Sequence, residues 1–318
     1  MKMNPGVLIF GSIAAVWASF MMVVWWPTYT IWRPKPPVSD IWRALTPREE
    51  QGRLLYIANG CTYCHTQFIR NLDWDLGAGR IAQAGDYIRE QPHLLGSERT
   101  GPDLSQEGGE HPDDWHLAHY NNPRHIRPES VMPSFEFLGR EKIEALIAYK
   151  QGLGFKDADF RVQRQRTWKM KTVEAYQGGP DKNVEWLHSH VPEPWTKLPN
   201  PYPTTEAGLK RGHKIYQSFC IGCHGPIGDG MGPAQPYLYP PPLNFTLLKG
   251  RGVSGGILYY QIMNGITGTA MPYFKRELQS EKIWDVGSYV AVTFIGETDA
   301  GAEPKGIAAA YEPPAEEK

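Results

Sequence analysis

The chain has 318 residues, of which 41% are hydrophobic, and 33 Lys and Arg against 34 Asp and Glu give a formal net charge of −1. This length suits about two domains, each with a core of its own. The balanced charge lacks the basic footprint of a nucleic-acid-binding protein, so specific chemistry must reside in local motifs.

Residues 7–26 form an uncharged, predominantly apolar run. About twenty helical residues span roughly 30 Å, the thickness of the hydrocarbon core of a bilayer. Trp25 and Trp26 close the run, where an aromatic belt is expected. A cleaved signal peptide would have a shorter apolar core and a small-residue cleavage site, which this run lacks. We therefore predict an uncleaved transmembrane anchor over residues 1–32, followed by a semi-rigid, Pro-rich spacer over residues 33–45.

Residues 46–153 are predicted to form a globular domain that contains a Cys-x-x-Cys-His run from Cys61 to His65. This run is the attachment signature of c-type haem, in which the two thiols bond the vinyl groups and the histidine becomes the proximal iron ligand. The residues from Thr46 onward have the capping pattern of a helix N-terminus. Apolar residues at helical spacing over residues 140–152 predict the helix that closes the domain.

Residues 154–203 are predicted to be a linker with little core of its own. Its first part is basic, which favours either a solvated helix face or a contact with a partner or with lipid headgroups. Its end, from Trp186 to Pro203, is rich in proline and is expected to run extended over the surface.

Residues 204–297 repeat the plan of the first domain, with a second Cys-x-x-Cys-His run from Cys220 to His224 and a predicted final helix near residues 280–294. The tail, residues 298–318, has acidic and proline residues and almost no bulky apolar ones. We predict that it is disordered.

The two motifs use all four cysteines of the chain, and each cysteine pair is followed by a histidine: Cys61, Cys64 and His65, then Cys220, Cys223 and His224. A zinc ribbon would place its cysteine pairs roughly 15–20 residues apart, whereas half of the chain separates these. A thioredoxin-like dithiol would need a βαβ pattern, and two disulfides would leave both histidines unexplained. We predict two covalently bound haem c groups.

Each iron needs a sixth ligand, and Met132 and Met271 are the candidates because both precede a proline and occupy the same place in the two halves. A thioether ligand raises the reduction potential of the haem. A lone methionine is usually core filler, but the recurrence favours ligation. Met231, in a glycine-rich loop seven residues after His224, is the competing candidate in the second half.

Other charged and imidazole side chains have weaker assignments. Arg99 and Arg124 are candidate partners of the haem propionates, since a guanidinium group binds a carboxylate through two hydrogen bonds. His116 and His119 lie three positions apart and share a face of a helix. They favour a propionate contact or a surface position over a metal site.

Several blocks within residues 45–150 occur in an order typical of one family. They are Gly60 to Arg70, Gly96 to Leu104, Asp113 to His116, Asn122 to Arg124 and Pro128 to Pro133. Together with the anchor they resemble the mono-haem cytochrome subunit of cbb3-type haem–copper oxidases. The resemblance implies haem c on Cys61 and Cys64, with His65 and Met132 as axial ligands. It also implies a large membrane partner that holds haem b and the oxygen-reducing haem–copper centre.

The chain departs from this family by continuing past its haem domain, because residues 204–297 add a region similar to a class I cytochrome c. We therefore expect an all-α fold with one N-terminal transmembrane helix and two class I cytochrome c domains. In the usual complex a separate di-haem subunit receives the electrons, and the added domain is expected to replace it.

The function expected from these features is electron transfer in a terminal respiratory oxidase, on the outer face of the bacterial inner membrane. Electrons would pass from a soluble donor, such as a small cytochrome c or a copper protein, through the second haem and then the first to the catalytic subunit. The alternatives are the cytochrome subunit of a nitric oxide reductase, a di-haem enzyme with one open iron, and a membrane-tethered redox or gas sensor.

Overall fold

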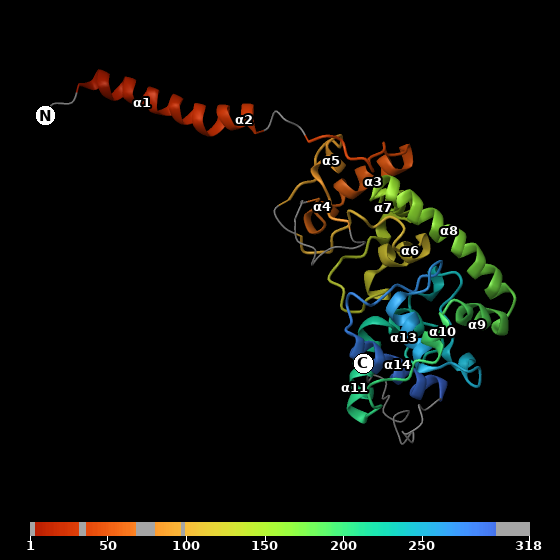
Figure 1. Ribbon diagram of the computed structural model, residues 1–318. Helices are drawn as coiled ribbons and strands as arrows, with labels where there is room; N and C mark the ends of the chain where they lie inside the picture. Colours follow the sequence, from red (N-terminus) through yellow and green to blue (C-terminus); the bar gives the residue numbers. More distant parts are fainter. Residues whose placement is uncertain (1–3, 32–35, 68–79, 97–98, 297–318) are drawn as a thin grey trace, which may run out of the picture.

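The computed structural model describes residues 4–31, 36–67, 80–96 and 99–296, and within these ranges it contains helices and no strand (Figure 1). The helices before the second motif are α1 (Pro5–Phe20), α2 (Trp26–Thr30), α3 (Pro47–Ala58), α4 (Cys61–Cys64), α5 (Ala84–Tyr87), α6 (Asp113–Asn121), α7 (Arg140–Gly152), α8 (Phe155–Gln177), α9 (Pro180–Ser189), α10 (Glu193–Thr196) and α11 (Glu206–Phe219). Those from the second motif onward are α12 (Ile221–His224), α13 (Gly255–Asn264) and α14 (Ser280–Val290). Short π-helical segments lie at Met21–Trp25 and Ala291–Ile295, and 3-10 turns at Pro123–His125, Glu136–Leu138, Gln235–Tyr237 and Phe245–Leu248.

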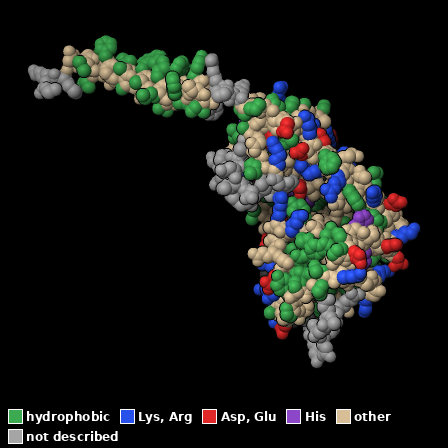
Figure 2. Space-filling view, in the orientation of Figure 1, with side chains coloured by type: hydrophobic (Ala, Val, Ile, Leu, Met, Phe, Trp, Pro, Cys, Tyr) green, Lys and Arg blue, Asp and Glu red, His purple; other side chains and the backbone are tan. Residues whose placement is uncertain are grey.

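The N-terminal helix stands away from the rest of the chain. Helices α1 and α2 and the π-helical turn between them form a continuous apolar rod over Pro5–Thr30, the one helix in the described part of the chain that is long and apolar enough to cross a membrane. Its side chains are not buried against the rest of the chain, and Figure 2 shows them as a green strip along the rod. The side chain of Asn4 caps its first turn by accepting a hydrogen bond from the Gly6 amide. An apolar surface of this size in water is unfavourable, so it belongs in lipid.

The first haem-motif unit is built on two crossing helices, α3 and α7. Thr46 and Glu49 form a reciprocal capping box at the start of α3, as the sequence predicts. The helices cross at Gly52, where a built Cβ atom would lie only 1.9 Å from the backbone oxygen of Ala145. Glycine is required there because any side chain would collide with the neighbouring backbone. The ring of Tyr56 packs on that of Tyr149 one turn further along, at 5.3 Å between centroids.

The second unit repeats this crossing with α11 and α14. A Cβ atom on Gly212 would lie 2.2 Å from the backbone oxygen of Asp285. The rings of Tyr216 and Tyr289 again pack one turn further along, at 5.5 Å between centroids. The duplication expected from the two Cys-x-x-Cys-His runs is therefore present in the packing. The described residues form an all-α fold, with one N-terminal apolar helix followed by two units of the same plan.

The linker has more helical structure than the sequence predicted. Residues 155–196 are largely helical, and the expected extended run from Trp186 begins inside helix α9. Val184, Leu187 and Val191 are buried, two of them within the core of the second unit. The linker has little core of its own, since Val184 and Val191 belong to the core of the second unit. The expectation of an extended run was wrong for residues 186–189 and 193–196, which are helical.

The basic start of the linker packs on the first unit. Arg161 on α8 donates hydrogen bonds to the backbone oxygens of Gly108 and Gln106, and Lys169 forms an ion pair with Asp114. The spacer reaches the same helix, since Arg43 binds both Glu49 and Asp159 through its guanidinium group. These basic side chains therefore serve contacts within the chain. The predicted tail, residues 298–318, lies outside the described residues, and the predicted domain boundaries stay predictions.

Candidate haem-attachment sites

The first motif sits on a short helix directly after α3. Gly60 ends α3 in a left-handed turn with φ of 72°, and α4 then carries Cys61 and Cys64. Cys61 is half-buried against the core, whereas Cys64 is exposed. Both thiols are free, as are those of Cys220 and Cys223. The motif thus presents two unpaired thiols on one turn of helix.

His65 is held by three neighbours. Its Nδ1 lies 2.9 Å from the Pro102 carbonyl oxygen, and the Tyr56 hydroxyl donates to the His65 carbonyl oxygen at 2.8 Å. Gly101 lies against the imidazole face, where a built Cβ would come within 2.3 Å of Cε1. Desolvation lowers the pKa of His65 to about 4, so the ring is neutral near pH 7. A neutral ring with its Nδ1 hydrogen on a carbonyl leaves the Nε2 lone pair free for iron.

His224 in the second motif has the same surroundings. Its Nδ1 lies 3.4 Å from the Leu243 carbonyl oxygen, and Tyr216 donates its hydroxyl to the Gly225 carbonyl oxygen at 2.6 Å. Burial lowers the pKa of His224 to about 4. The ring of Phe245 stacks on the imidazole at 4.4 Å between centroids. Both imidazole rings are therefore neutral near pH 7 and have Nδ1 near a backbone oxygen, which would suit a proximal ligand.

Met132 and Met271 occupy matching turns. The backbone N–H of each donates to the hydroxyl two residues earlier, Met132 to Ser130 at 3.3 Å and Met271 to Thr269 at 3.1 Å. Both side chains are half-buried and pack against the core of their own unit. Met231 is 67% exposed. The packing supports Met271 over Met231 as the sixth ligand, and the ligand assignments remain proposals.

Three buried polar atoms of the first unit make no hydrogen bond among the described residues. Trp115 Nε1, His116 Nε2 and Lys150 Nζ are buried without a hydrogen bond. Burial lowers the pKa of Lys150 to about 8. Burial also raises the pKa of Cys61 and lowers that of His65, and the charge of Lys150 is the next largest influence on both groups, so Lys150 lies near the motif. Buried donors need acceptors, and the carboxylates of a haem would supply them. The residues present therefore fit a haem group.

The comparisons decide the family. The family described as cytochrome c oxidase, mono-heme subunit/FixO, matches residues 1–174. The chain belongs to this family. Cytochrome c oxidase, cbb3-type, subunit III, matches residues 207–290. No curated protein matches the chain. A solved chain of the Kuenenia stuttgartiensis reducing HAO-like protein complex is 19% identical, covering 79% of this chain and 97% of its own, with a TM-score of 0.28.

Membership of the FixO family fixes the broad function. The chain is an electron-transfer cytochrome subunit of a cbb3-type oxidase and carries covalently bound haem c. It is anchored in the membrane and forms a complex with the catalytic haem–copper subunit.

The predicted propionate partners lie in different surroundings within the FixO segment. Arg99 is buried and paired with Asp103 at 3.1 Å. Arg124 is exposed, and both assignments stay predictions. His119 is half-buried, with its Nε2 3.1 Å from the Met132 sulfur. Lys150 was missed by sequence reasoning, although its place on the apolar face of the helix that carries Ile143 was a usable signal.

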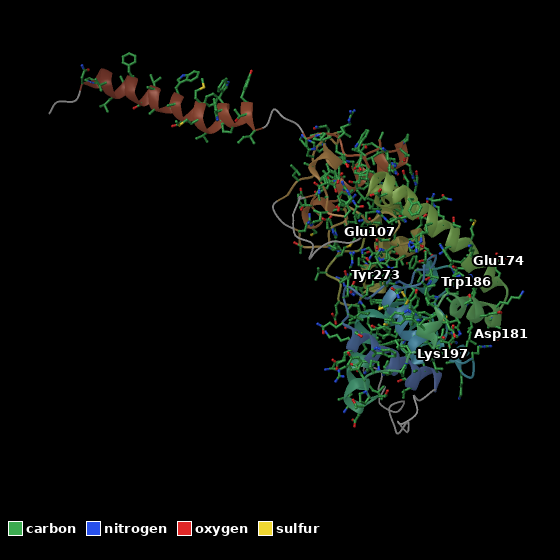
Figure 3. The ribbon with its side chains drawn as sticks, in the orientation of Figure 1. Glu107, Glu174, Asp181, Trp186, Lys197 and Tyr273 are labelled. Carbon is green, nitrogen blue, oxygen red and sulfur yellow. The ribbon has the colours of Figure 1, made fainter. Side chains whose placement is uncertain are left out.

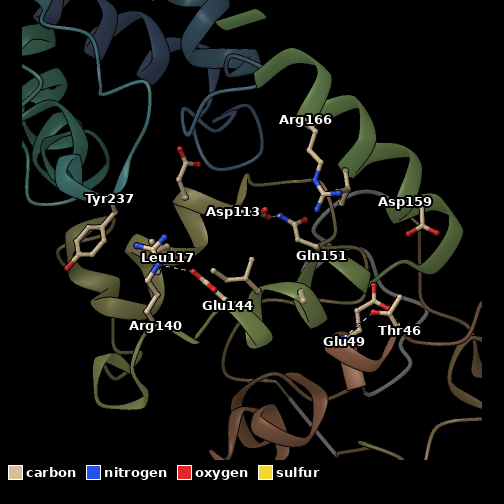
Figure 4. A pocket seen from close by; sticks show the side chains of 14 residues that line it. Thr46, Glu49, Asp113, Leu117, Arg140, Glu144, Gln151, Asp159, Arg166 and Tyr237 are labelled. Atoms are coloured by element: carbon tan, nitrogen blue, oxygen red, sulfur yellow. Dashed lines mark hydrogen bonds and ion pairs between the residues drawn. The ribbon is translucent and has the colours of Figure 1, made fainter. Parts of the chain in front are cut away.

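A separate cleft of about 590 Å³ lies between α6, α7 and α8, with Tyr237 of the second unit at its rim (Figure 4). Polar and charged side chains dominate its lining, including Glu49, Glu144 and Arg166. No motif residue lines it, so it is not a haem site.

Proposed function

We propose that this FixO-family chain carries two haem c groups and relays electrons from a soluble donor to the catalytic subunit. Cys61 and Cys64 attach the first group, and Cys220 and Cys223 the second. His65 with Met132 and His224 with Met271 are the axial pairs. Each haem, when bound, accepts and releases one electron at a time.

The matched placement of His65 and His224 carries this proposal. In both units the Nδ1 atom faces a backbone oxygen and a tyrosine hydroxyl bonds the backbone beside the motif. A thioether on each opposite side completes six-coordination and leaves no position for a substrate, which favours an electron carrier over a di-haem enzyme. The family match favours oxygen rather than nitric oxide as the final acceptor.

We further propose that electrons enter at the second unit, pass to the first and leave to the catalytic subunit on the periplasmic side. The spacer supports this order. The Ser39 amide donates to the Gly85 carbonyl oxygen at 3.1 Å and Ile41 is buried, so the spacer is packed on the first unit a few residues after the anchor. The second unit lies at the far end of the molecule from α1 (Figure 1). A soluble donor therefore meets the second unit more readily.

Replacing Met271 with histidine tests the order. Two nitrogen ligands favour the ferric state relative to a thioether, so the potential of the second centre falls. Oxidation of the natural donor by the complex should then slow severely. Turnover driven by a small reductant that reaches the first unit should persist. Unchanged donor oxidation alongside a confirmed spectral change would mean that the first unit accepts electrons directly.

A further inference from the structure

The second motif packs directly on the first unit. Gly222, inside the second Cys-x-x-Cys-His run, lies against the backbone of His125 and Ile126. A built Cβ would lie 2.3 Å from the His125 carbonyl oxygen and 2.8 Å from that of Ile126. Only glycine allows this approach, because backbone atoms cannot rotate away as the end of a side chain can. The contact therefore requires this residue type at this position of the motif.

An apolar cluster continues the contact. Ala118 on α6 is fully buried in a cluster with Ala234 and Leu238 of the second unit. Ile126 from the first unit and Cys223 of the motif pack against the same cluster. A thiol that would bond a haem thus packs against an apolar cluster to which both units contribute.

Charged side chains fix the edge of this contact. Arg127 donates to the Glu277 carboxylate at 2.8 Å and places its guanidinium over the ring of Phe219, 4.1 Å from the centroid. Ser218 donates to Glu129 at 3.2 Å. Further along, the Tyr273 side chain reaches Glu110, and Figure 3 shows Tyr273 close to the first unit near Glu107. The two units are therefore held by directional contacts as well as by apolar packing.

Residues 123–132 of the first unit, which make these contacts, also contain Met132, the proposed sixth ligand of the first centre. Pro123–His125 begins this segment, Arg127 is bonded to the second unit, and Met132 follows five residues later. We propose that the contact of Gly222 and Cys223 with residues 123–132 is the fixed electron-transfer junction between the two units. This inference rests on the proposed function.

The corresponding face of the first motif is open. Tyr63 holds the position equivalent to Gly222 and is 83% exposed, and Cys64 is exposed as well. Within the described part of the chain, the same face of the repeat is therefore closed in the second unit and exposed in the first. At the junction one electron leaves the ferrous second centre and reduces the ferric first centre, with no bond made or broken and no proton required. A fixed contact makes this step independent of diffusion.

The test uses the full chain, isolated in detergent without donor or catalytic subunit. Gly222→Val forces the backbones apart, whereas Tyr63→Val changes the equivalent exposed position and is the matched control. After rapid partial reduction, the parent and Tyr63→Val should show an intramolecular phase whose rate does not depend on protein concentration. Gly222→Val should lose this phase, together with lysine cross-links between the two units.

Gly222→Val lies inside the motif and could lose the phase because haem is not attached. A second pair of variants, outside the motif, therefore tests the same junction. Arg127→Glu places two carboxylates together and should lose the rapid phase. The charge swap Arg127→Glu with Glu277→Arg should restore at least part of it. A rapid phase at the parent rate in both Gly222→Val and Arg127→Glu, or a swap that restores nothing, overturns the junction. This experiment contains no soluble donor. Its outcome is therefore independent of whether the donor delivers electrons to the second unit.

Discussion

The crossing of α11 and α14 makes a strong prediction for Gly212→Ala. The new methyl carbon would lie 2.2 Å from the Asp285 backbone oxygen and 2.8 Å from the Cβ of Tyr289. Ordinary contact begins near 3.4 Å, so the helices must separate by about 1 Å. Neither neighbour is the end of a flexible side chain, and the strain therefore passes into the core of the second unit.

Two opposing effects set the magnitude. Alanine is favoured over glycine in a helix interior by about 1 kcal/mol. Overpacking a well-packed core costs about 1–3 kcal/mol, and a clash with backbone belongs at the upper end of that range. We expect a net loss of about 1–2 kcal/mol in the free energy of unfolding. A unit of this size should then lose about 4–8 °C in Tm for each kcal/mol.

Gly287→Ala is the matched control on the facing helix. Its built Cβ would meet nothing closer than 3.8 Å, so the helix propensity should dominate and stabilise by up to about 1 kcal/mol. Thermal unfolding of the full chain in detergent, followed by circular dichroism, measures both variants. A Gly212→Ala protein as stable as the parent would refute the close crossing, and so would equal shifts in the two variants.

Two further predictions concern the centres themselves. Intact-mass measurement should show two haem additions, and changing both cysteines of one motif to serine should remove one of them; a single addition in the parent would contradict the proposal. Oxidised protein should show the weak thioether-to-iron charge-transfer band of His/Met ligation, reduced in part by Met132→Ala and by Met271→Ala but not by Met231→Ala, because Met231 is 67% exposed. A band unchanged in Met271→Ala would reassign the second ligand.

The features that local patterns determine were predictable. A Cys-x-x-Cys-His run indicates attachment of haem c from five residues alone. A run of about twenty predominantly apolar residues indicates a membrane-spanning helix. The capping box at Thr46 also follows from a short spacing, and the second Cys-x-x-Cys-His run predicts the duplicated plan. In these cases the partners lie within a few turns or repeat in both halves.

The missed features depend on contacts between distant segments. Val184 belongs by sequence to the predicted linker, yet it is buried in the core of the second unit, and no local sequence pattern reveals that contact. Gly222 reads as an ordinary filler residue of its motif, yet it is required by a carbonyl group about a hundred positions earlier. Lys150 interrupts the apolar face of its helix, and its buried Nζ atom makes no hydrogen bond among the described residues. Its role depends on the groups around it, which the sequence of the helix does not reveal.

The stiff helix α8 has a consequence for how strong the contact between the units must be. A tethered partner experiences an effective concentration on the order of 1 mM, even with a flexible linker. An interface worth only about 4 kcal/mol is half-occupied at that concentration, and a 23-residue helix packed on both units restricts the search further. Contacts as modest as one exposed ion pair and a small apolar cluster are then sufficient. On two separate proteins the same surfaces would form a complex only at concentrations of about 1 mM. Covalent fusion therefore substitutes for the higher binding affinity that two independent subunits would need.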